Sequence, residues 1–101
     1  MRRTVDEQLA FLAHRQSDMV AVAVRDVEAG HAEYASLDSD LRRPIELPEP
    51  IKLGHKVALV EIAEGADVIE YGERVAVATA DIAIGTLVHV HNVRSTRWQL
   101  A

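Results

Sequence analysis

A five-residue pattern that recurs three times limits how this chain can fold. The pattern joins an acidic residue, a β-branched apolar residue, two further residues and a glycine, at residues 26–30, 61–65 and 81–85. We interpret each copy as a single helical turn between strands, in which the carboxylate caps free amides and the Val or Ile enters the core. The glycine then adopts the left-handed conformation that ends the turn without a Cβ clash. Three such corners predict a compact structure whose strands change direction repeatedly.

The segments between these corners are short apolar runs of the length and composition typical of strands. Hydrophobic residues make up 49% of the chain but aromatics only 4%, so the core must consist of aliphatic side chains. The prolines at 44, 48 and 50 favour a loop over residues 37–50, with one strand near Ile45. The other runs bounded by polar or turn residues predict six strands, at residues 19–24, 31–36, 56–60, 68–71, 75–79 and 87–92. The sequence therefore predicts a mainly β fold.

The first residues show a different periodicity, which predicts a helix over residues 4–16. Thr4 and Glu7 have the spacing of a capping box, and Val5, Leu9 and Leu12 form one apolar stripe at helical spacing. We therefore divide the chain into an N-terminal helical extension, residues 1–17, and a small β-domain, residues 18–101.

Length and charge exclude several classes of function. A chain of 101 residues fits one small domain with a thin core, and the absence of cysteine excludes disulfides and thiolate chemistry. The net charge of −5 disfavours nucleic-acid binding, because the phosphate backbone repels an acidic protein. No run approaches the length of a membrane span, and no signal peptide is evident, so we expect a cytoplasmic protein with neither membrane nor nucleic acid as a partner.

The candidate site residues are histidines with a lysine and an asparagine. His89 and His91 lie two residues apart in a predicted strand, so both side chains should project from one face, about 7 Å apart. That separation allows both imidazoles to bind one metal ion or one carboxylate. Asn92 follows them, and His55 and Lys56 would join them if their two strands were neighbours. The alternative, that the histidines lie on a half-exposed face and bond locally, stays open, because a tight metal site needs at least three protein ligands and no third is evident.

The second half of the chain resembles a known family through an ordered set of motifs. The shared residues are Gly54-His55-Lys56-Val57-Ala58-Leu59, Ile62, Gly65, Val68, Tyr71-Gly72, Ala78, Asp81-Ile82, Gly85 and His89-Val90-His91-Asn92. They resemble the SAF-type domain of the altronate/galactarate dehydratases and of the two-subunit sulfolactate sulfo-lyases, over residues 18–93. The resemblance implies a β-clip fold. One departure is Ala76, which stands where the family usually has a glycine.

The resemblance also implies a function. In the larger family members this module precedes a bigger domain that dehydrates a sugar acid, with a divalent metal, commonly iron, implicated. We therefore expect a small subunit, not catalytic alone, whose His55, Lys56, His89, His91 and Asn92 help to form a site for a sugar acid with a large catalytic subunit. The bigger domain lies either on a separate polypeptide or on another part of a longer protein.

Two other readings stay open. A stand-alone β-clip module would bind a carbohydrate or a protein without catalysis, and an oligomerisation domain would pair with copies of itself. We expect a homo-oligomer in isolation, because removing the catalytic partner would expose an apolar docking face.

Overall fold

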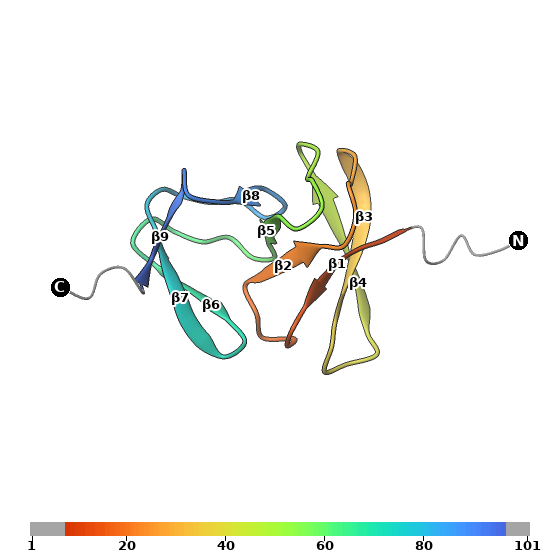
Figure 1. The fold of residues 1–101 in the computed structure, drawn as a ribbon, viewed down its shortest axis with the longest axis horizontal. Coiled ribbons are helices and arrows are strands. Elements are labelled where there is room, and N and C mark those ends of the chain that lie inside the picture. The colour runs from red at the N-terminus through yellow and green to blue at the C-terminus, as the bar shows by residue number, and fades with distance from the viewer. Residues whose placement is uncertain (1–7, 97–101) are drawn as a thin grey trace, which may run out of the picture.

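The protein is an all-β structure built from short strands in two sheets (Figure 1). The structure is a computed structural model, and it describes residues 8–96. Within those residues every element is a strand, which confirms the predicted mainly β fold. The strands are β1 (Leu9–Ala13), β2 (Val20–Ala23), β3 (Gly30–Ser36), β4 (Arg42–Leu47), β5 (Lys56–Ala58), β6 (Asp67–Glu70), β7 (Glu73–Ala78), β8 (Leu87–Val88) and β9 (Val93–Ser95). Residues 8–96 contain no helix long and apolar enough to cross a membrane.

The larger sheet has six strands in the order β4-β3-β1-β2-β5-β8, and the smaller sheet has the order β6-β7-β9. All neighbouring pairs are antiparallel except β1 and β3, which are parallel. Figure 1 shows β1 to β4 at one end of the molecule, β6, β7 and β9 at the other, and β5 and β8 between them. Pro44 falls within β4, where the prediction placed one strand near Ile45, and β4 lies at a sheet edge, the position that tolerates a missing ladder donor.

The predicted N-terminal helix is wrong over its described part. Leu9–Ala13 is strand β1, which lies inside the larger sheet between β3 and β2, and Phe11 pairs with Ala23 on one side and Tyr34 on the other. Residues 4–7 of the predicted helix lie outside the described residues. Phe11 has no exposed surface. Burying an aromatic side chain contributes about 1.5–3 kcal/mol, which outweighs the few tenths that separate helix propensities.

The three corners bury their apolar residue as predicted. The exposed fractions are 5% for Val27 and 2% for Ile62 and Ile82. The glycines at 30, 65 and 85 have positive φ, as predicted. The last two corners close as β-turns with glycine at the third position, because the amide of Ala66 donates to the carbonyl of Ala63 at 3.0 Å and that of Thr86 to that of Ala83 at 3.2 Å. The interpretation as helical turns is therefore wrong in its hydrogen-bond pattern.

Each corner carboxylate accepts a hydrogen bond from a backbone amide of another corner, and not from an amide of its own corner. Ile62 and Ile82 form an isolated antiparallel bridge. Beside it, Asp81 Oδ1 accepts a hydrogen bond from the Glu64 amide at 2.9 Å, and Glu61 Oε2 accepts one from the Ile84 amide at 3.3 Å. Corners 61–65 and 81–85 thus stabilise each other, and residues 26–30 pair in the same way with residues 51–54, a corner that the sequence pattern did not show.

Buried residues form two hydrophobic clusters. The first packs on the larger sheet around Phe11, Ile51 and Val57, and the second lies around Val20 and Val68, where the larger sheet meets the smaller one. All of these side chains are almost completely buried, so each contributes on the order of 2 kcal/mol to folding.

Asp18 fixes the smaller sheet against the larger one. Its carboxylate is only 3% exposed, and Oδ2 accepts hydrogen bonds from the amides of His14 at 3.0 Å and Arg15 at 3.3 Å. Oδ1 accepts from the amide of Tyr71 at 2.7 Å, in the hairpin between β6 and β7. The carboxylate therefore ties the β1–β2 connection to that hairpin and helps to hold the two sheets together.

Candidate functional site

Pairing of β5 with β8 brings two of the predicted site residues together. Lys56 lies opposite Val88 in this antiparallel pair, so His55 and His89 continue from the two strands on the same side. Their ring centroids are 5.3 Å apart, with the planes inclined at 60°. The strand that precedes His89 is therefore a neighbour of the strand that follows His55, as the predicted site required.

The segment that carries His89, His91 and Asn92 is a turn, so its prediction as a strand is wrong. Strand β8 ends at Val88, and the Asn92 amide donates to the His89 carbonyl at 2.9 Å. The Asn92 side chain closes the turn, because its Oδ1 accepts from the His89 amide at 3.0 Å and its Nδ2 donates to the Leu87 carbonyl at 2.8 Å. His89 and His91 therefore do not share one face of a strand.

The turn assigns different surroundings to these residues. Asn92 is buried, with 9% of its surface exposed, and its hydrogen bonds position the turn. His89 and His91 are both exposed. Only His89 lies against another histidine, and among the described residues no group of three or more His, Cys, Asp or Glu side chains could hold a metal ion.

His55 carries an unmet hydrogen bond. The residue is half-buried, and its Nδ1 atom is buried with no hydrogen-bond partner among the described residues. A buried polar atom left in this way costs about 1–3 kcal/mol. A ligand, a water molecule or a second chain can supply the missing partner of such an atom.

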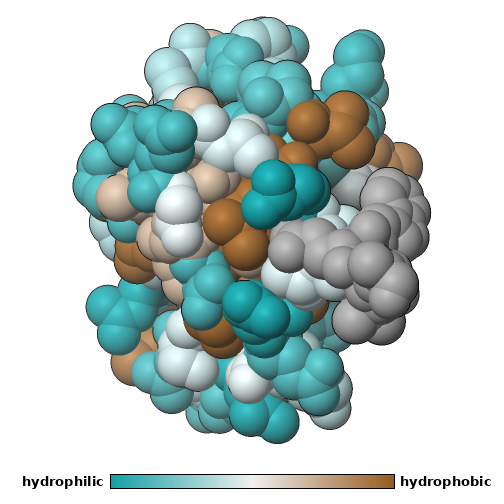
Figure 2. All heavy atoms as spheres, turned by 90° about the vertical axis from the view of Figure 1, so that its left-hand side faces the viewer, coloured by the Kyte–Doolittle hydropathy of each residue, from teal (hydrophilic) through white to brown (hydrophobic). Residues whose placement is uncertain are grey.

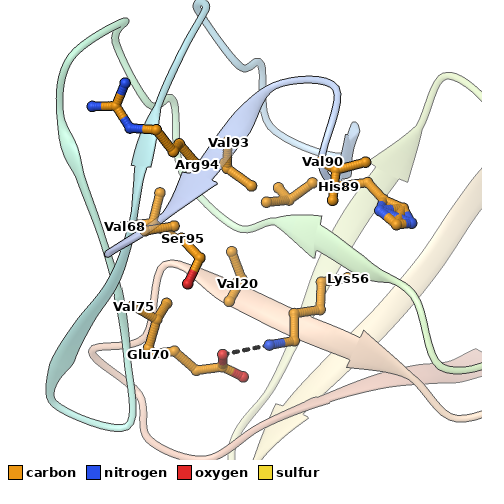
Figure 3. Close-up of a pocket in the computed structure, with 12 residues that line it drawn as sticks. Val20, Lys56, Val68, Glu70, Val75, His89, Val90, Val93, Arg94 and Ser95 are labelled. Carbon is orange, nitrogen blue, oxygen red and sulfur yellow. Dashed lines mark hydrogen bonds and ion pairs between the residues drawn. The ribbon is translucent and has the colours of Figure 1, made fainter. Parts of the chain in front are cut away.

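Lys56 forms an ion pair across the two sheets. Its Nζ lies 2.6 Å from Oε1 of Glu70, which joins β5 of the larger sheet to β6 of the smaller one (Figure 3). The Lys56 side chain is 42% exposed and that of Glu70 only 14%. A substrate carboxylate would therefore compete with Glu70 for this ammonium group.

A pocket opens between the two sheets beside the histidines, and sequence reasoning missed it. Its volume is about 420 Å³, and its walls are mainly apolar and rich in valine, with Lys56, Glu70 and His89 at its edge (Figure 3). The valines come from β2, β6, β7, β8 and β9 and from the turn after β8. Each valine resembles an ordinary core residue in the sequence, and only the packing of the two sheets shows that together they line an open cavity.

The arrangement of the histidines limits what this chain can do chemically. Two neighbouring imidazoles can donate to one anion or supply two ligands to a shared metal ion. A tight metal site needs at least a third protein ligand, and the described residues place no group of three or more His, Cys, Asp or Glu side chains there. The geometry is therefore that of a partial site, open on the side where His89 is exposed.

Comparison with known proteins gives a consistent picture. The sequence profile described as "Altronate/galactarate dehydratase SAF domain" matches residues 9–96. The altronate dehydratases of Bacillus subtilis (strain 168) and Escherichia coli (strain K12) are 36% identical over 86 residues and 44% identical over 78 residues, which is 85% and 77% of this chain. The aligned regions span only 16% and 15% of the lengths of those two relatives.

A second group of relatives is similar in size to this chain. The (2R)-sulfolactate sulfo-lyase subunit alpha of Chromohalobacter salexigens is 37% identical over 90 residues, which covers 87% of this chain and 96% of that subunit. The corresponding subunit of Paracoccus pantotrophus is 39% identical over 61 residues, 60% of this chain and 88% of that protein.

Proposed function

The chain belongs to the altronate/galactarate dehydratase SAF-domain family, and from that membership we propose that it acts as the small subunit of a sugar-acid dehydratase. The observation that carries this proposal is the match over 96% of a protein that is itself named as a subunit. A relative of that kind works with at least one other polypeptide. We infer that the partner of this chain is a large catalytic subunit with the chemistry of the dehydratases.

The incomplete site around His55 and His89 supports the proposal that two polypeptides together form the catalytic site. Dehydration of a sugar acid needs a base that removes a proton from carbon and an acid that protonates the leaving hydroxyl group. His55 and His89 can bind the carboxylate or a hydroxyl of the substrate and orient it, while the partner supplies the remaining groups. Lys56 could bind a substrate carboxylate in exchange for Glu70, and Asn92 holds the turn that carries His89. His91 is exposed on the same turn and is therefore accessible to the partner.

A divalent metal ion such as iron fits this region only if two chains share it. The neighbouring rings of His55 and His89 offer two imidazoles, and Nδ1 of His55 has no hydrogen-bond partner among the described residues. Two imidazoles are fewer than the three protein ligands typical of a tight site. The sequence pointed to His89 with His91, whereas the ring that lies against His89 is that of His55. A bound cation would polarise an oxygen of the substrate, and its other ligands would come from the large subunit.

The stand-alone binding module is the weaker reading. The pocket of about 420 Å³ has mostly apolar walls, which do not suit a polyhydroxylated ligand. We further infer that the two curled sheets form the β-clip of this family and that the protein is cytoplasmic.

Reconstitution tests the proposal. The chain is mixed with the large dehydratase polypeptide of the same organism, and turnover of altronate, galactarate and (2R)-sulfolactate is followed. We expect turnover of one of these acids that requires both polypeptides. Equal turnover by the large polypeptide alone would overturn the proposal.

A further inference from the structure

The valine-lined pocket between the two sheets is too apolar to be the sugar-acid site. Most of its wall is apolar and consists of Val20, Val68, Val75, Ala76, Val88, Val90 and Val93. The Lys56 ammonium at its edge is already paired with Glu70. A sugar acid placed there would set most of its hydroxyl groups against these apolar side chains, and each polar group buried without a partner costs about 1–3 kcal/mol. An occupant that suits this wall is an apolar side chain.

The apolar surface continues from the pocket onto the outside of the molecule. Val90, at the tip of the turn after β8, lines the pocket and is 79% exposed, more than any other exposed large hydrophobic residue in the described part of the chain. Figure 2 shows the end of the molecule that carries β6, β7 and β9, where apolar side chains gather near the middle of the face among hydrophilic ones. A contiguous apolar surface with a polar rim is typical of a protein interface.

The rim of the pocket carries a charge that indicates what the partner presents. Arg94 on β9 is exposed, its side chain points away from the pocket (Figure 3), and it forms no ion pair within residues 8–96. A carboxylate on the partner would complement it.

The pocket and the histidine pair share one residue. His89 lines the pocket, and its ring also lies 5.3 Å from that of His55. A polypeptide seated in the pocket would therefore have its neighbouring residues within reach of both histidines. Binding at the pocket and completion of the site are thus linked by geometry.

We propose that the valine-lined pocket between the two sheets, with Val90 and Arg94 at its rim, is the docking surface for the large catalytic subunit. An aliphatic or aromatic side chain of that subunit fills the pocket, and one of its carboxylates meets Arg94. This inference rests on the proposed function, because it identifies the surface used by the partner named there.

The test measures binding rather than turnover. The dissociation constant between this chain and the large dehydratase polypeptide of the same organism is measured by calorimetry for the wild type, Val90→Asp, Arg94→Glu and Leu41→Asp. Leu41 is the matched control, because it is 56% exposed and lies just before β4, in the larger sheet. Val90 is highly exposed, so the Val90→Asp variant should fold, and circular dichroism checks this.

We expect Val90→Asp to weaken binding at least about tenfold, because a carboxylate would replace an apolar contact and be buried against the partner without a counter-charge. Arg94→Glu should weaken it about three- to tenfold and make it less sensitive to salt. Leu41→Asp should stay within about twofold of the wild type. Binding of Val90→Asp and Arg94→Glu within about twofold of the wild type would overturn the inference.

Two further outcomes separate this inference from the proposed function. If the mixed polypeptides turn over substrate but Val90→Asp binds normally, the docking surface is wrong and the subunit role stands. If sedimentation shows a dimer of this chain alone that Val90→Asp breaks, while binding to the large polypeptide is unchanged, the pocket belongs to a contact between copies and the inference is again wrong.

Discussion

Replacing Gly85 with alanine should destabilise the domain far more than the same replacement at Gly65, although both glycines end equivalent corners. Their backbone conformations are almost the same, with φ of +86° at Gly85 and +87° at Gly65. A Cβ atom at Gly65 would have no atom within 4 Å. A Cβ atom at Gly85 would overlap the carbonyl oxygen of Glu46 and would lie 3.4 Å from Cδ of Pro48.

The expected magnitudes follow from these two environments. A left-handed conformation costs a residue with a Cβ about 1–2 kcal/mol, and the lower entropy of the unfolded chain offsets about 0.4–1 kcal/mol of this. Gly65→Ala should therefore lower the free energy of unfolding by about 1 kcal/mol. At Gly85 the backbone around Glu46 must also move, and overpacking of this kind adds about 1–3 kcal/mol. We expect a total loss of about 2–4 kcal/mol, a large part of the roughly 5–15 kcal/mol typical of a small domain.

Urea denaturation followed by circular dichroism measures both variants against the wild type. Because the φ penalty is common to both variants, the difference between them isolates the contact with Glu46. A difference below about 0.5 kcal/mol would refute the reasoning, since it would mean that residues 46–48 do not pack on this corner.

Two further variants test the contacts that shape the site. Asp18→Ala should lower the free energy of unfolding by about 2–4 kcal/mol, because it leaves three backbone amides without their acceptor; a loss below about 1 kcal/mol in chemical denaturation would show that the carboxylate does not hold the sheets together. Asn92→Ala removes both side-chain hydrogen bonds that close the turn after β8, and should cost about 1–3 kcal/mol and lower turnover of the assembled enzyme. Asn92→Asp keeps the oxygen that accepts from the His89 amide, so it should recover part of the lost stability and part of the lost turnover. If Asn92→Asp recovered neither, the role assigned to Asn92 in closing the turn would be wrong.

The three corners and most of the strands could be predicted because their signals are local. A short apolar run, an acid before a β-branched residue and a glycine that needs positive φ are all visible within a few residues. Val27, Ile62 and Ile82 are accordingly buried where the pattern placed them. The partner that each corner carboxylate caps could not be predicted, because Asp81 and Glu64 meet only through pairing between distant segments.

The strand β1 was missed because a helical stripe and a buried strand compete in the same short segment. The spacing of Leu9 and Leu12 suits a helix, yet Phe11 between them is completely buried. The segment forms a strand because β1 pairs in parallel with β3, a contact between segments about twenty residues apart. No local periodicity contains that information.

The sequence predicted which residues contribute to the site but not how they are arranged in space. The neighbouring rings of His55 and His89 depend on the register of β5 against β8, and the turn that carries His89 depends on a buried asparagine side chain. The His-x-His spacing suggested a strand because alternation of residues along the segment was the only local pattern used to assign it. Asn92, a residue type that often closes turns through its side chain, was the signal that could have corrected it.

The most direct test of the account is the turnover of the reconstituted enzyme with the histidine pair removed. The double variant His55→Asn and His89→Asn is compared with wild type and with His31→Asn, an exposed histidine on β3 whose Nδ1 pairs with Glu46 at 2.7 Å. With the small subunit saturating, we predict that the double variant lowers kcat/KM at least about tenfold while His31→Asn stays within about twofold of the wild type. Unchanged kcat/KM in the double variant would contradict the claim that this chain completes the catalytic site.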